Sequence, residues 1–106
     1  MVYYNPSALE DYSDILYGLL TWPKHPLEPE HAKQYMRDIE KVCRSLGNLL
    51  FHKKTIYDIH KRYGDYVYIY RRNRNTSWFI IYNKDSLNNI LIERIMNNYL
   101  TIVNSI

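Results

Sequence analysis

The sequence of 106 residues contains few of the residues that build special sites, with one cysteine and three glycines. A single thiol, Cys43, excludes an internal disulfide and any zinc site made from several thiolates. The glycines are Gly18, Gly47 and Gly64, and their separation excludes a glycine-rich loop that cradles phosphates. The four histidines have no metal-ligand spacing, so we expect neither a metal nor another cofactor.

Long apolar runs are also absent. The run from Trp78 to Tyr82 is far shorter than the roughly 20 residues that a membrane-spanning helix needs. The first ten residues have neither the basic segment nor the apolar segment of a secretory signal. We therefore expect a cytoplasmic protein with no membrane partner.

The composition is that of an ordinary globular protein, with 46% hydrophobic and 24% charged residues. A chain of this length has room for one hydrophobic core. We expect a single domain over residues 1–106.

The net charge of +3 is concentrated in one segment. Residues 52–74 contain seven lysines and arginines and two aspartates, a net charge of +5, whereas residues 1–51 carry a net charge of −2. A local excess of positive charge attracts polyanions such as nucleic acid or an acidic protein. The alternative is a basic surface that only faces water. The cations of this segment are Lys53, Lys54, Lys61, Arg62, Arg71, Arg72 and Arg74.

Two amphipathic helices are predicted in the first half of the chain. Asn5-Pro6 and the capping-box spacing of Ser7 to Glu10 both signal the start of the first helix, two residues apart, and Trp22-Pro23 ends it. The second helix is predicted over residues 30–50. Its apolar stripe is Ala32, Tyr35, Met36, Ile39, Val42, Cys43, Leu46, Leu49 and Leu50, and we assign this stripe to the core.

After Phe51 the apolar pattern becomes extended. Residues 66–70 and 77–82 predict a hairpin with a basic turn, and residues 90–96 predict a further strand. Residues 99–103 form either a last short strand or a tail. With a short strand at residues 2–4, the predicted fold is α+β. A two-helix hairpin packs on one face of a twisted antiparallel sheet in the order β-α-α-β-β-β.

The strands combine cations with tyrosines, and two interpretations are open. Arginine and lysine can bind RNA phosphates while tyrosines stack on unpaired bases. Alternatively, the tyrosines form a cross-strand ladder and the arginines keep the turn soluble.

The order of these segments resembles the RelE/ParE superfamily of toxins from bacterial type II toxin–antitoxin pairs. The resemblance covers nearly the whole chain and rests on residues 2–12, the helix from Ala32 to Leu49, the hairpin from Tyr66 to Tyr82 and the last strand Ile90 to Met96. Pro6 to Tyr12 is similar to the family's S/P-x-A-x-x-D-L helix start. Arg94 matches an arginine of the family's last strand, whereas the family's histidine and paired arginines are replaced here by Asn97, Tyr99 and Leu100.

The resemblance implies a toxin that is held inactive by an acidic antitoxin encoded nearby. Three activities stay open: cleavage of mRNA on the ribosome without a metal, inhibition of DNA gyrase, and a catalytically inactive binding module for an acidic protein or RNA. For RNA cleavage the candidate catalytic residues are Arg71, Arg74, Arg94 and Tyr99. The candidate nucleic-acid-binding residues are Lys53, Lys54, Lys61, Arg62 and Arg72.

Overall fold

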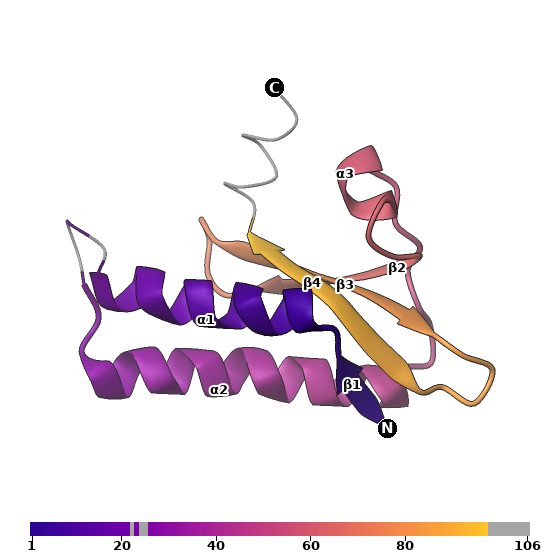
Figure 1. Ribbon diagram of the computed structural model, residues 1–106, viewed down its shortest axis with the longest axis horizontal. Helices are drawn as coiled ribbons and strands as arrows, with labels where there is room; N and C mark the ends of the chain where they lie inside the picture. Colours follow the sequence, from indigo (N-terminus) through magenta and orange to yellow (C-terminus); the bar gives the residue numbers. More distant parts are fainter. Residues whose placement is uncertain (22, 24–25, 98–106) are drawn as a thin grey trace.

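The computed structural model describes residues 1–21, 23 and 26–97, and these form an α+β fold. A short strand, β1 (Val2–Tyr4), precedes two helices, α1 (Pro6–Thr21) and α2 (Pro29–Ser45). A 3-10 turn, η1 (Leu46–Asn48), and a short helix, α3 (Asp58–Lys61), lead to the strands β2 (Tyr66–Arg71), β3 (Ser77–Lys84) and β4 (Ile90–Asn97). Figure 1 shows α1 and α2 side by side as a hairpin. The predicted order of strands and long helices is confirmed; α3 was not predicted.

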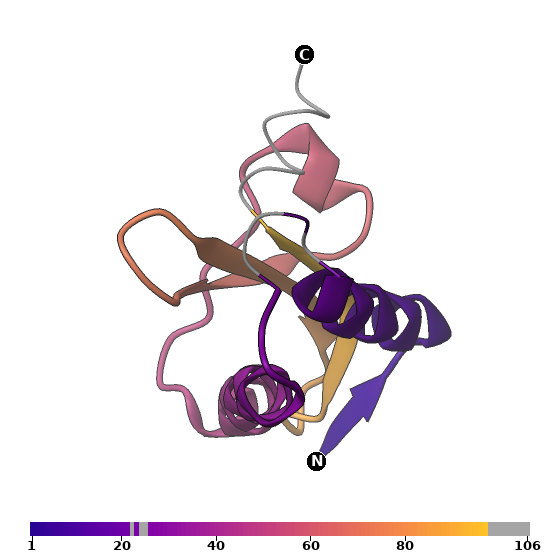
Figure 2. The same ribbon diagram turned by 90° about the vertical axis from the view of Figure 1, so that its left-hand side faces the viewer.

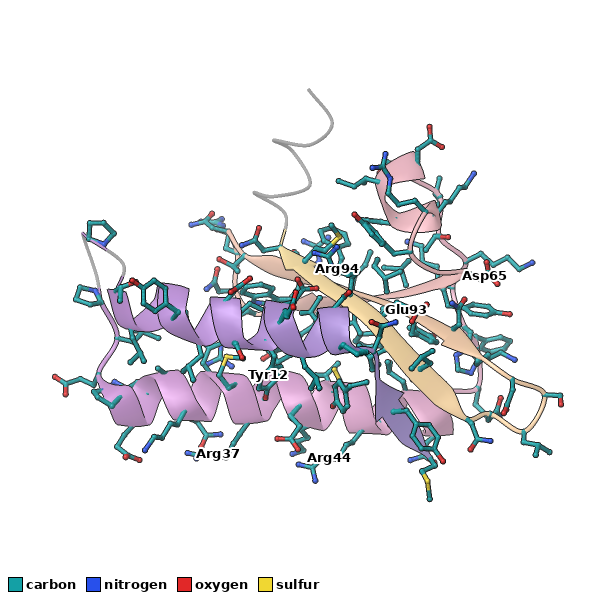
Figure 3. All side chains as sticks on the ribbon, viewed as in Figure 1. Tyr12, Arg37, Arg44, Asp65, Glu93 and Arg94 are labelled. Atoms are coloured by element: carbon teal, nitrogen blue, oxygen red, sulfur yellow. The ribbon has the colours of Figure 1, made fainter. Side chains whose placement is uncertain are left out.

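The first helix begins at the Asn5-Pro6 signal. The Oδ1 of Asn5 accepts a hydrogen bond from the N–H of Ser7 at 2.9 Å, and Pro6 occupies the first helical position, where its missing N–H costs nothing. Tyr12 bridges the two helices, because its hydroxyl donates to the carbonyl of Met36 (Figure 3).

The second helix is shorter than predicted. Its buried residues are Ala32, Met36, Ile39 and Cys43, so the assignment of this stripe to the core is confirmed. Burial raises the pKa of the Cys43 thiol to about 12. The helix ends at Ser45, however, and the prediction that Leu50 belongs to its buried stripe is wrong, because this side chain is 91% exposed.

The sheet is mixed, with the strand order β1-β4-β3-β2. The antiparallel prediction is correct for β2, β3 and β4, but β1 pairs in parallel with β4, with Val2 opposite Ile90. A parallel neighbour is possible here because the helical hairpin carries the chain back across the sheet. The strands β3 and β4 are central, as their apolar runs predicted.

Each face of the sheet packs against a different part of the chain. The helix face, which carries Trp78, Ile80 and Tyr82, packs against α1 and α2 to form the main core. The opposite face, called here the α3 face, packs against the segment that contains α3. Figure 2 shows α2 nearly end-on below the sheet, α1 obliquely beside it and α3 above it. The residues of this smaller core are Ile59, Tyr63, Val67, Ile69, Phe79, Ile81 and Met96.

A β-bulge in β4 changes which of its side chains lie on the helix face. Ile81 pairs with Arg94 and Tyr82 pairs with Ile92, so Glu93 has no partner in the register. The carboxylate of Glu93 accepts hydrogen bonds from the side-chain amides of Asn5 and Asn83, both at 3.2 Å. The extra residue shifts the alternation, and Arg94 therefore lies on the α3 face, opposite Ile81.

The segment after α3 crosses β3 closely at Gly64. A Cβ at this position would lie 3.0 Å from the Cγ2 of Ile81 and 3.0 Å from the carbonyl oxygen of Tyr82. Only glycine fits this approach without displacing β3. This close approach fixes the backbone of the segment that carries Lys61 and Arg62 beside β3.

Candidate polyanion interface

Four exposed cations surround the beginning of β2, and we call them the α3 cationic cluster: Lys53, Lys54, Lys61 and Arg62. Lys54 and Lys61 line a surface pocket of about 300 Å³ together with Thr55, Asp65 and Tyr66. Among the described residues, no carboxylate lies within 4.0 Å of a charged nitrogen of this cluster. These charges are therefore available to an anionic ligand.

The cluster is positioned by backbone pairing along the outer edge of β2. The N–H of Val67 donates to the carbonyl of Lys53, and the N–H of Thr55 donates to the carbonyl of Asp65, both at 2.9 Å. The Oγ1 of Thr55 also donates to the carbonyl of Gly64 at 3.0 Å. Residues 53–55 thus act as a short extra strand antiparallel to the start of β2.

Arg71 and Arg74 lie at the opposite end of β2, in and beside the β2–β3 turn, and both are exposed. The six residues of β2 separate them from the α3 cationic cluster by roughly 17 Å along the strand. Figure 1 shows α3 and this turn at opposite ends of the strand. The seven cations of residues 52–74 therefore form two groups instead of one patch.

Arg72 is neutralised within the protein. Its guanidinium donates to a carboxylate oxygen of Asp38 on α2 and, at 3.0 Å, to the hydroxyl of Tyr70. It also lies over the ring of Tyr35, 4.1 Å from the centroid. The hydrogen bond from Arg72 lowers the pKa of Asp38. Arg72 thus fastens the hairpin to α2, and contact with a phosphate requires the loss of this pair.

Arg94 is also paired. Its Nε and one terminal nitrogen donate to the two oxygens of Asp11 at 2.7 and 2.9 Å, and the N–H of Ile95 donates to Asp11 at 2.9 Å. The guanidinium lies 4.7 Å from the centroid of the Tyr63 ring. The hydrogen bond to Asp11 raises the pKa of Arg94. Figure 3 shows Arg94 beside α1, where it joins β4, α1 and the segment after α3.

The tyrosines of β2 are partly buried against the helices. Tyr66, Tyr68 and Tyr70 lie against the helix-face core, and the rings of Tyr66 and Tyr82 stack with centroids 5.6 Å apart. Of the two interpretations of the tyrosines, this arrangement is the cross-strand ladder. Tyr99 lies outside the described residues.

Two histidines close to the cluster are packed rather than open to a ligand. The Nδ1 of His52 is 2.7 Å from the hydroxyl of Tyr82, and His60, at 1% exposure, packs against Phe79 with centroids 4.9 Å apart. The Nε2 atoms of both rings are buried without a hydrogen-bond partner. Burial lowers the pKa of each histidine.

The acids that pair with Arg94 and Arg72 were not predicted from the sequence. Asp11 could have been found, because it occupies the aspartate position of the helix-start motif on which the family resemblance rests. No pattern in the sequence links Asp38 to Arg72, which is 34 residues away.

Comparisons with known proteins identify no relative: no family model, no curated protein and no solved structure matches this chain. None of the helices in residues 1–21 and 26–97 is long and apolar enough to cross a bilayer. Among these residues, no three histidine, cysteine or acidic side chains gather as metal ligands do.

Proposed function

We propose that this chain is the toxin of a type II toxin–antitoxin pair, acts in the cytoplasm and inhibits growth by binding mRNA on the ribosome and cleaving it. The main support is the arrangement of the fold, in which a helical hairpin covers one face of a sheet and exposed cations, with no carboxylate within 4.0 Å among the described residues, flank both ends of its outer strand β2. A fold alone does not define a function, so the proposal depends equally on these cations.

In this proposal the α3 cationic cluster holds the RNA backbone. Ammonium and guanidinium groups bind phosphates, and the pocket between Lys54 and Lys61 places two such groups near each other. Arg71, at the far end of β2, and Arg74, in the β2–β3 turn, can contact a second part of an extended polyanion. Cleavage further requires Arg94 or Tyr99 to act at the scissile phosphate, and Arg94 must first leave Asp11.

A second candidate is a protein that binds without cleaving, either a gyrase inhibitor or an inactive relative. The pairing of Arg94 with Asp11 favours it, because this guanidinium is already committed to a structural contact. The packing of His52 and His60 favours it as well, because the Nε2 atom of each ring is buried and is not presented to a ligand.

Inducible expression in a bacterial host tests the proposal. We expect growth arrest and, by mapping RNA ends, cuts within translated messages. Lys54→Ala combined with Lys61→Ala should weaken both effects about tenfold or more. Lys33→Ala combined with Lys41→Ala removes the same charge from exposed positions on α2 and should leave both effects unchanged.

Each remaining outcome selects a different function. Arrest without RNA cuts, together with loss of supercoiling by purified gyrase, would replace RNA cleavage with gyrase inhibition. Folded protein that causes no arrest would leave the inactive binding module.

A further inference from the structure

The outer edge of β2 is paired only at its beginning, where Val67 bonds to Lys53. Residues alternate along an antiparallel strand between those that bond to one neighbour and those that bond to the other. Val67 bonds outward to Lys53, so Ile69 and Arg71 also direct their N–H and C=O groups away from β3. Among the described residues, no group accepts from or donates to these outward backbone positions of Ile69 and Arg71.

The unpaired part of this edge begins where the segment before Lys53 turns away from the sheet. Lys54 lies opposite Tyr66, and continuation of the same register would place Phe51 opposite Ile69. Instead His52 packs on Tyr66 and Tyr82, and Phe51 is 88% exposed. The fold therefore leaves a position beside Ile69 and Arg71 where another extended segment can continue the strand formed by residues 53–55.

We propose that this open edge receives an extended, acidic segment of a partner protein, which adds to the sheet as a strand in line with residues 53–55. Backbone pairing supplies affinity in this mode of binding, and alternate side chains supply specificity. The identity of the partner rests on the proposed function: if the chain is a toxin, the acidic segment belongs to its antitoxin, which would bind as an added strand.

The positive charges beside this edge favour an acidic partner segment. On the α3 face, Lys53 lies opposite Val67. The side chains of Val67, Ile69 and Arg71 lie in one row along this face of β2, and Arg74 follows in the β2–β3 turn. None of these three cations has a carboxylate within 4.0 Å among the described residues. Acidic side chains at alternate positions of the added partner strand would lie between Lys53 and Arg71 and neutralise their charges. The intervening residues of the partner strand would lie beside Tyr68 and Tyr70, where apolar side chains fit.

The same charges disfavour other occupants. A second copy of the chain that paired through this edge would bring Arg71 and Arg74 of one molecule near the same residues of the other, and cations on a strand edge commonly prevent such pairing. RNA phosphates accept hydrogen bonds but do not supply the alternating donors and acceptors of a strand.

Amide hydrogen exchange of the full chain, followed by NMR, tests this proposal. The probe is a capped nine-residue peptide in which glutamate and valine alternate. At saturating peptide we expect exchange at Ile69 and Arg71 to slow about tenfold or more, because their N–H groups become hydrogen-bonded. Tyr68 and Tyr70, which already bond to β3, should change little.

The controls separate backbone pairing from charge. A peptide of alternating lysine and valine, and the glutamate peptide N-methylated at alternate residues, should each bind at least about tenfold more weakly. Arg71→Glu should weaken the glutamate peptide by a similar factor, whereas Arg37→Glu on α2, also exposed, should not.

Three results would overturn the inference. They are binding of the glutamate peptide without protection of Ile69 and Arg71, equal protection by an oligouridine, and protection that depends on protein concentration with no peptide present. Absence of toxicity would remove the proposed function but not the edge, because the exchange measurement does not depend on growth arrest.

Discussion

The contact between Asp11 and Arg94 should contribute more to stability than any exposed ion pair of this chain. Asp11 accepts three hydrogen bonds at 2.7 to 2.9 Å, and its side chain is only 12% exposed, against 23% for Arg94. Asp11→Ala removes the acceptor and leaves the guanidinium and the N–H of Ile95 without their partner. Removing one partner of a fully buried pair costs about 3–5 kcal/mol, and the partial exposure of Arg94 reduces the expected loss to about 2–3 kcal/mol.

Urea unfolding followed by far-UV circular dichroism measures this loss. The control is Glu40→Ala, which breaks the exposed pair between Glu40 and Arg44 and should cost less than about 1 kcal/mol. Asp11→Ala combined with Arg94→Met should recover part of the loss, because no unpaired guanidinium then remains. Equal free energies of unfolding for Asp11→Ala and Glu40→Ala would refute the reasoning.

Three further predictions concern smaller features. Gly64→Ala should destabilise the protein by about 1–3 kcal/mol, because the new Cβ meets β3. Gly18→Ala should stabilise the protein by about 0.5–1 kcal/mol, because its Cβ has no neighbouring atom within 4 Å outside its own helix and alanine favours the helix α1. Urea unfolding of the two variants compares these free energies. Burial lowers the pKa of His60 in the folded protein, so the imidazole takes up a proton more readily in the unfolded chain. The free energy of unfolding should therefore fall as the pH drops below 6.5 and become constant below the folded-state pKa of His60. His60→Leu should flatten this part of the stability–pH profile, and an unchanged slope would assign the titration to another group. Cys43, whose pKa burial raises to about 12, should react with a thiol reagent at the rate of unfolding, and rapid labelling of native protein would contradict its packing.

Local patterns in the sequence predict most of the elements, because those elements depend on neighbouring residues. The Asn5-Pro6 signal sets the start of α1, and the apolar stripe through Met36 and Cys43 sets the buried side of α2. The continuous apolar run of β3 correctly indicates a central strand. Periodicity did not reveal α3, which has only four residues and is too short to show a repeat.

Features that depend on distant residues could not be predicted in the same way. The direction of β1 is set by its neighbour β4, and the exposure of Leu50 follows from the turn of the chain after η1. For the candidate site, the sequence located the excess of positive charge but not its division into two groups. That division depends on the course of β2 and on the pairing of Arg72 with Asp38.

The parallel pairing of β1 with β4 bears on when the chain can fold during its synthesis. Val2 and Ile90, which lie opposite each other, are 88 positions apart, so the ribosome makes nearly all of the described chain before β1 gains its neighbour. Long-range pairing of this kind is slow and comes late in folding. A nascent chain therefore emerges with its first strand unprotected, and the protein acquires its finished surface only after translation has passed β4.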